Sequence, residues 1–169
     1  MIRKAGLFVV TVMAVGLFSS SPMAVTPSWA DNRTGIYIAI TEQPALTRFA
    51  EILEQVNLHR ALQGPGPYTV FAPSNDALAK LPAGYIERLV TNENRVEVYE
   101  LLTHHVVIDR LDKVDLNDGD TYDALGRQRL TIEREGGAVF VNQAQIIDAD
   151  IANKAGVVHI IDQVIIAAP

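Results

Sequence analysis

The sequence predicts an α+β domain with its helices mainly in the first half and its strands in the second. Apolar residues recur at helical spacing between residues 45 and 103, whereas short β-branched runs separated by glycine-containing turns follow from residue 105 onward. This segregated order favours α+β over an alternating parallel α/β fold. No internal repeat, linker or low-complexity run interrupts the order, so we predict one domain over residues 31–169.

The first predicted helix covers residues 45–62. Its apolar residues have helical spacing and form one face that we expect to be buried: Leu46, Phe49, Ala50, Leu53 and Val56. The GPGP segment (64–67) ends this helix, and YTVFA (68–72) then has the β-branched and aromatic composition of a short buried strand.

Ser74 is placed to cap the next helix, because a serine at this position accepts a hydrogen bond from a backbone N–H of the first turn. We expect that helix to end at Leu81, since Pro82 follows. Two further helical patterns cover residues 84–91 and 95–103. The apolar side of the second is predicted to contain Val96, Tyr99, Leu102 and Thr103.

The second half has strand chemistry in five runs. They are VVI (106–108), GDTYDALG (119–126), QRLTIERE (128–135), AVFVNQAQIID (138–148) and GVVHIIDQVII (156–166). Gly136-Gly137 between the third and fourth runs predicts a β-hairpin, because two adjacent glycines accommodate its tight turn.

Residues 1–30 have the pattern of a cleaved signal peptide. Arg3 and Lys4 precede an apolar run, Ala5–Phe18, that is too short to span a bilayer comfortably, and the small residues of Ser28-Trp29-Ala30 suit a signal peptidase. We therefore expect a mature chain that begins at Asp31 and is secreted or periplasmic. An uncleaved N-terminal anchor is the alternative.

The charge of the mature chain excludes several partner classes. Without Arg3 and Lys4, 12 basic residues face 20 acidic ones, which gives a net charge of −8. Nucleic-acid binding and docking on anionic lipid both need clustered Lys and Arg, so we expect neither. The chain has no cysteine and therefore no disulfide.

No catalytic, cofactor or metal site is predicted. After the signal peptide Ser74 is the remaining serine, and its position suits a helix cap better than a nucleophile. The adjacent His104 and His105 point apart on a helix or a strand, so one metal ion cannot easily bind both. The acidic loop at residues 112–120 fails the EF-hand spacing, which favours a solvated turn over a calcium site.

Three motifs resemble the fasciclin-like domain family. YTVFAPSNDALAKLP (68–82) resembles its first signature, AGVVHIIDQVII (155–166) resembles its closing strand, and LLTHHVV (101–107) lies where the family has a Tyr-His pair followed by two valines. The resemblance runs from about residue 36 to 166. The residues that carry the first and last motifs, expected to be structural, are Thr69, Phe71, Pro73, Ser74, Asn75, Asp76 and His159.

The resemblance implies a wedge-shaped β-sandwich with helices packed along one edge. It also implies a non-enzymatic protein without a cofactor that binds a surface protein, matrix or polysaccharide. A separate alternative is carriage of an apolar small molecule or lipid, since a cleft can open between packed layers.

The partner-binding candidates implied by the resemblance are His104, His105, Asp150 and Ile151. His104 replaces the family tyrosine, so pH-sensitive or partner-specific behaviour is expected there. Asp150-Ile151 matches an Asp-Ile pair linked to integrins in some animal members, and the alternative for it is a strand end with Ile151 packed inward. His105 is expected to be buried between a helix and a strand, with its ring hydrogen-bonded to Asn75 or Asp76.

Overall fold

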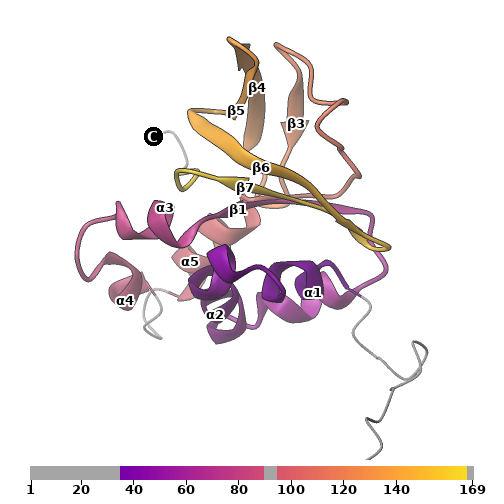
Figure 1. Cartoon of the computed structure of the whole chain (residues 1–169). Coiled ribbons are helices and arrows are strands. Elements are labelled where there is room, and N and C mark those ends of the chain that lie inside the picture. The colour runs from indigo at the N-terminus through magenta and orange to yellow at the C-terminus, as the bar shows by residue number, and fades with distance from the viewer. Residues whose placement is uncertain (1–34, 90–94, 167–169) are drawn as a thin grey trace, which may run out of the picture. The chain divides into compact units, whose positions relative to one another are not determined.

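Helices that lie mainly in the first half, and a seven-stranded mixed sheet of which all strands but one follow residue 105, confirm the α+β class (Figure 1). The computed structural model describes residues 35–89 and 95–166, and the predicted signal peptide lies outside them. No helix within these two ranges is long and apolar enough to cross a bilayer.

The helical segments agree with the prediction over residues 95–103, whereas the helix after Ser74 ends at residue 79 and not at Leu81. The segments are α1 (Ile36–Thr41), η1 (Pro44–Leu46), α2 (Thr47–Gln55), η2 (Leu58–Gln63), α3 (Asn75–Ala79), α4 (Tyr85–Leu89) and α5 (Arg95–Thr103). The prediction of one helix over residues 45–62 is wrong. Asn57 adopts a left-handed conformation with φ 61° and separates α2 from the 3₁₀ helix η2, which still buries Leu58 and Leu62.

The predicted inner side of α5 is also wrong in part. Val98 and Leu102, spaced four residues apart, are buried in the core together with Thr103, whereas Val96 is 71% exposed and Tyr99 is 45% exposed. The helical period alone leaves the orientation of such a mixed helix open. Packing against the rest of the core selects the face with Val98.

The strands follow one another in the order β2-β1-β7-β6-β5-β4-β3. Their bounds are β1 (Tyr68–Pro73), β2 (Val106–Val107), β3 (Thr121–Asp123), β4 (Arg129–Glu135), β5 (Ala138–Val141), β6 (Ala144–Asn153) and β7 (Gly156–Ile161). The β4–β5 hairpin at Gly136-Gly137 is confirmed. The predicted strand 138–148 is instead a second hairpin, because the backbone turns at Asn142, where φ is 47°.

The seven strands form one sheet that folds back on itself. A bridge between Val107 of β2 and Ala124, just after β3, joins its two ends, and the N–H of Leu125 donates to the carbonyl of Val106 at 2.7 Å. Register shifts in β6 allow the strand to bend. The strands β3, β4 and β5 therefore lie on one side of the parallel β1–β7 pair and the helices lie on the other (Figure 1).

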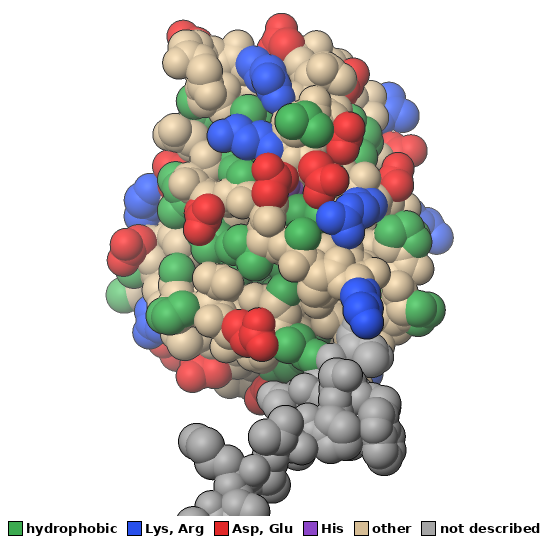
Figure 2. All heavy atoms as spheres, turned by 45° about the vertical axis from the view of Figure 1, so that its right-hand side comes forward, with side chains coloured by type: hydrophobic (Ala, Val, Ile, Leu, Met, Phe, Trp, Pro, Cys, Tyr) green, Lys and Arg blue, Asp and Glu red, His purple; other side chains and the backbone are tan. Residues whose placement is uncertain are grey.

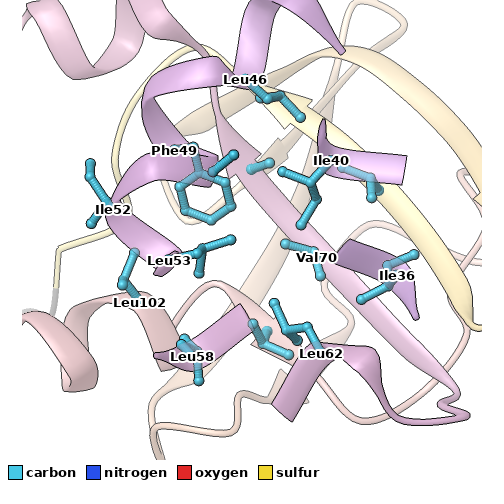
Figure 3. Packing of buried hydrophobic residues seen from close by; sticks show 14 of the residues in the cluster. Ile36, Ile40, Leu46, Phe49, Ile52, Leu53, Leu58, Leu62, Val70 and Leu102 are labelled. Atoms are coloured by element: carbon cyan, nitrogen blue, oxygen red, sulfur yellow. The ribbon is translucent and has the colours of Figure 1, made fainter. Parts of the chain in front are cut away.

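Residues of β1 alternate between two hydrophobic cores. Val70 packs against the helices, where Phe49 and Leu53 of α2 surround it (Figure 3). Phe71 points the other way, into a core with Leu130 and other residues of the β3–β6 strands. The central strands are thus buried on both faces.

Ser74 caps α3 as predicted, since its Oγ accepts a hydrogen bond from the N–H of Ala77 at 3.0 Å. We expect Ser74→Ala to lower the free energy of unfolding by about 1 kcal/mol, because the first turn loses this buried acceptor. Urea unfolding measures the change, and Ser74→Thr, which keeps the hydroxyl, serves as the control. Equal stability of all three proteins would contradict the capping role.

Candidate functional site

His105 joins α5 to the C-terminal segment. Its ring is fully buried, Nδ1 donates to the carbonyl of Leu101 at 2.8 Å, and Nε2 accepts from the N–H of Ile165 at 3.0 Å. An N–H can only donate, so the proton of the neutral ring lies on Nδ1. Burial lowers the pKa of His105 from 6.5 to about 4. His105 is therefore a neutral internal link, and the expectation of a buried, hydrogen-bonded ring is confirmed.

The expected partners of His105 were wrong. The Asn75 side chain accepts from the N–H of Arg48 at 3.1 Å and donates to the carbonyl of Pro44 at 3.0 Å, so it joins the start of α3 to the start of α2. Asp76 is exposed in the first turn of α3. Backbone groups satisfy the histidine instead.

His104 is only half-buried, and one of its nitrogens is held by the fold. Its Nε2 donates to the carbonyl of Gly126 at 3.1 Å. The other nitrogen, Nδ1, is buried and has no hydrogen-bond partner within residues 35–89 and 95–166. The ring packs so closely on Gly126 that a Cβ there would collide with it. His104 thus fills the junction between α5 and the turn after β3.

His159 performs a similar structural role in β7. Nε2 donates to the carbonyl of Leu111 at 2.8 Å, Nδ1 accepts from the N–H of Asp150 at 3.3 Å, and the ring stacks on Phe71. Burial is the main cause that lowers the pKa of His159. This imidazole therefore connects β7 to β6 and to the loop before β3.

The structure places Asp150-Ile151 inside β6, at an irregularity in its pairing with β7, and not at a strand end. Asp150 is exposed and adopts φ 60°, and its carboxylate accepts from the N–H of Lys113 at 2.7 Å. Ile151 is half-buried against the helical core. Asp150 is thus partly engaged by the fold and partly available to a partner.

Thr69 and Pro73 are also structural. The Thr69 hydroxyl donates to the carbonyl of Asp109 at 2.7 Å and accepts from the N–H of Leu111 at 2.9 Å, which fixes the loop after β2 on β1. Pro73 is buried at the end of β1. The first motif therefore serves the core and its connections.

A cleft of about 440 Å³ lies between α2 and the segment from α3 to α4, which sequence reasoning missed. Polar residues on its lining include Arg48, Glu51 and Glu87. A second pocket of about 20 Å³, lined by apolar residues and His105, shares four lining residues with the cleft: Ile52, Leu78, Leu81 and Ile86. The Pro82–Gly84 break between two helical patterns was the available signal for an opening here.

The buried histidines predict an acid-sensitive fold. Because the pKa of His105 is lower in the folded state, the unfolded chain binds the proton first, and stability is lost as the pH falls from about 6.5 towards 4. His105 alone accounts for about 3 kcal/mol, and His159 acts in the same direction. Urea unfolding between pH 7 and 4.5, with NMR of the His105 ring protons, measures both effects. A ring that protonates above pH 6 would contradict this prediction.

Among the described residues, no group of three or more His, Asp or Glu side chains is placed to hold a metal ion. The hydrogen bonds of Ser74, His105 and His159 all serve the fold. The chemistry that remains available for recognition lies in the cleft and on the outer surface.

Comparison with known proteins identifies the family. A model of the fasciclin domain matches residues 44–167. Protein sll1483 of Synechocystis sp. is 41% identical over 114 residues, which are 68% of this chain and 63% of that protein. The uncharacterized protein sll1735 of the same organism is 37% identical over 134 residues, which are 78% of this chain and 96% of that protein.

The fold is similar to a solved FAS1 domain pair from the insect cell adhesion molecule fasciclin I. The TM-score is 0.69 at 14% sequence identity, over 79% of this chain and 51% of that one. The chain thus spans just under two thirds of sll1483 and about half of the domain pair. The motifs, the fold and the family model agree, and this chain belongs to the fasciclin domain family.

Proposed function

We propose that the protein is an exported, non-catalytic binding module that attaches to a cell-surface or matrix component. The observation that carries the proposal is the use of Ser74, His105 and His159 as internal supports of a fasciclin domain. Neither His105 nor His159 has a free ring nitrogen to accept a proton from a substrate, and the Ser74 hydroxyl is occupied as a helix cap. The similar solved fold comes from a cell adhesion molecule.

Asp150 and its surroundings are the best placed of the predicted contact residues. Val114 follows Lys113, whose N–H donates to Asp150, and Val114 is 79% exposed. The exposed Asp150 carboxylate offers a partner a charge, and the exposed Val114 side chain adds apolar contact area. Acidic side chains on the face shown in Figure 2 are interspersed with basic ones and form no continuous field.

Asp150→Asn separates adhesion from folding. The asparagine oxygen can still accept from Lys113, and asparagine tolerates a positive φ, so we expect the stability to change little. Retention of the full exported protein on cell-surface extracts is expected to fall about threefold or more. Asp150→Ala, which also removes the hydrogen bond, is the comparison. Retention of Asp150→Asn equal to wild type removes Asp150 from the contact, and no retention of the wild type overturns the proposed function.

Export is tested independently of binding. Expression of the full chain in a bacterial host is expected to yield an extracytoplasmic protein whose first residue is Asp31, because the signal peptidase removes residues 1–30. N-terminal sequencing and the intact mass identify the cleavage point. A cell-associated protein that retains residues 1–30 supports the anchor alternative instead.

The cleft between α2, α3 and α4 supports a second candidate function, which is carriage of an apolar small molecule. Its volume is within the range of ligand sites, and its apolar residues lead to the pocket beside His105. Ile52 of α2 and Ile86 of α4 line both the cleft and this inner pocket, so a ligand that parts them would reach inward. A ligand would then place its apolar part inward, with its polar part near Arg48.

Ala79→Trp tests carriage, since Ala79 is exposed and lines the cleft. Binding of a fluorescent fatty acid to the wild type is expected, with at least a tenfold loss in Ala79→Trp. Ala45→Trp, an exposed alanine of η1 outside the cleft, is the matched control and should bind normally. No binding to the wild type, or equal binding by all three proteins, overturns this candidate.

A further inference from the structure

A groove of about 600 Å³ lies on the outer side of β4, away from the cleft of the helices. Thr131 and Glu133 of β4 form one wall, and the β5–β6 turn and the C-terminal segment form the others. Side-chain amides dominate its polar lining, from Gln128, Asn142, Gln143 and Gln163. Leu130 and Ile132, which alternate with the wall residues of β4, are buried in the core, so the wall rests on a rigid strand.

The lining suits a ligand that is rich in hydroxyl groups. Each side-chain amide offers two donors and one acceptor, and each ligand hydroxyl both donates and accepts, so the two groups complement each other. Asn142 is already oriented, because its Oδ1 accepts from the N–H of Thr131 at 2.8 Å and this contact directs the amide group. Ile166, 56% exposed, provides an apolar surface for the C–H groups of a sugar ring.

One amide of the groove has an unsatisfied acceptor. Oε1 of Gln128 is buried and has no hydrogen-bond partner in the described ranges 35–89 and 95–166. A buried acceptor without a donor is costly, so such groups in folded proteins usually have a partner. A rotation of this side chain towards the groove would bring the oxygen to a ligand hydroxyl.

An extended peptide fits the groove less well, because the backbone of β4 has no free edge there. The N–H and carbonyl of Thr131 both bond to Asn142, and those of Ile132 bond to Asp120 and Gly119. The N–H of Arg134 donates to Asp118. A peptide strand therefore has no ladder to join, and recognition must come from the side chains.

Charge narrows the class of ligand further. Arg129 pairs with Asp123 at 3.4 Å, whereas Glu133 has no ion-pair partner among residues 35–89 and 95–166. With a mature net charge of −8, the domain repels polyanions. We propose that this groove binds a neutral, hydroxyl-rich polysaccharide. The inference rests on the proposed function, since it names the surface component to which the module attaches.

NMR titration of the ¹⁵N-labelled mature protein tests the site directly. The probes are neutral oligosaccharides from dextran, mannan and chitin, with dextran sulfate as the anionic probe and an unstructured decapeptide pool as the peptide probe. At least one neutral probe is expected to shift the amide signals of Thr131, Gln143 and Ile166. No groove shift with any neutral probe at 20 mM, or groove shifts only with the peptide pool, overturns the proposal.

Matched variants identify the groups that bind. Gln143→Ala and Gln163→Ala are each expected to weaken the effective probe about three- to tenfold, because each loses one or two hydrogen bonds to hydroxyls. Gln43→Ala removes an amide outside the groove and should bind like wild type. Glu133→Lys should increase binding of dextran sulfate. Equal binding by the two groove variants and Gln43→Ala contradicts the assignment.

The retention assay separates this inference from the proposed function. If protease treatment of the surface extract abolishes retention while glycan removal does not, the module binds a protein. The polysaccharide inference then fails and the proposed function stands. If glycosidase treatment abolishes retention, and Gln143→Ala and Gln163→Ala are not retained on the untreated extract, the proposed function and the polysaccharide inference both stand.

Discussion

Gly156→Ala is expected to prevent the chain from folding stably. Gly156 begins β7 and pairs with Tyr68 at the start of the parallel β1–β7 ladder, with φ 154°. A Cβ at this position would overlap the carbonyl oxygen of Tyr68, and the carbonyl carbon and the backbone nitrogen of Tyr68 would each lie 2.8 Å from it. Backbone atoms in paired central strands cannot move aside without breaking the ladder, so relief requires separation of β1 from β7.

The expected loss exceeds about 4 kcal/mol, which is comparable with the whole stability of many domains. Soluble yield, circular dichroism and urea unfolding measure it. Gly137→Ala is the matched control, because Gly137 also has a positive φ, 88°, but nothing lies within 4 Å of its Cβ position. The control should lose only about 1–2 kcal/mol. Equal urea midpoints for both variants would show that the overlap with Tyr68 is relieved at little cost.

His105→Ala is expected to lower the free energy of unfolding by roughly 3–5 kcal/mol. The substitution leaves the carbonyl of Leu101 and the N–H of Ile165 without their partner in a buried site, and it opens a cavity beside Phe49. The C-terminal segment should loosen first, because the ring holds Ile165. Urea unfolding and hydrogen exchange at the Ile165 amide measure the two effects.

The neighbouring His104→Ala is the control. His104 is half-buried and makes one hydrogen bond, at 3.1 Å to Gly126, so its loss should cost only about 1 kcal/mol. It should also leave exchange at Ile165 unchanged. If the two alanine variants are equally stable, His105 does not support the fold as described.

The fold was largely predictable because local patterns carry it. The Ser74 cap, the Gly136-Gly137 hairpin and the α5 pattern follow from residues close together in sequence. The helix break at Asn57 could not be predicted in this way, because the apolar spacing continues across it into η2. The inner face of α5 also depended on its neighbours, because Val96 and Tyr99 look as suitable for burial as Val98.

The sequence predicted which histidine would be buried, but not which groups it would bond to. The sequence by itself determined the α+β class, the family motifs and the burial of His105 among apolar residues. Only the tertiary structure decided what the ring bonds to, since Ile165 lies 60 residues away and offers a backbone N–H that every non-proline residue carries. The same holds for the groove on β4. Its wall residues alternate on one strand, but the amides facing them come from a turn and from the chain end, and folding alone brings them together.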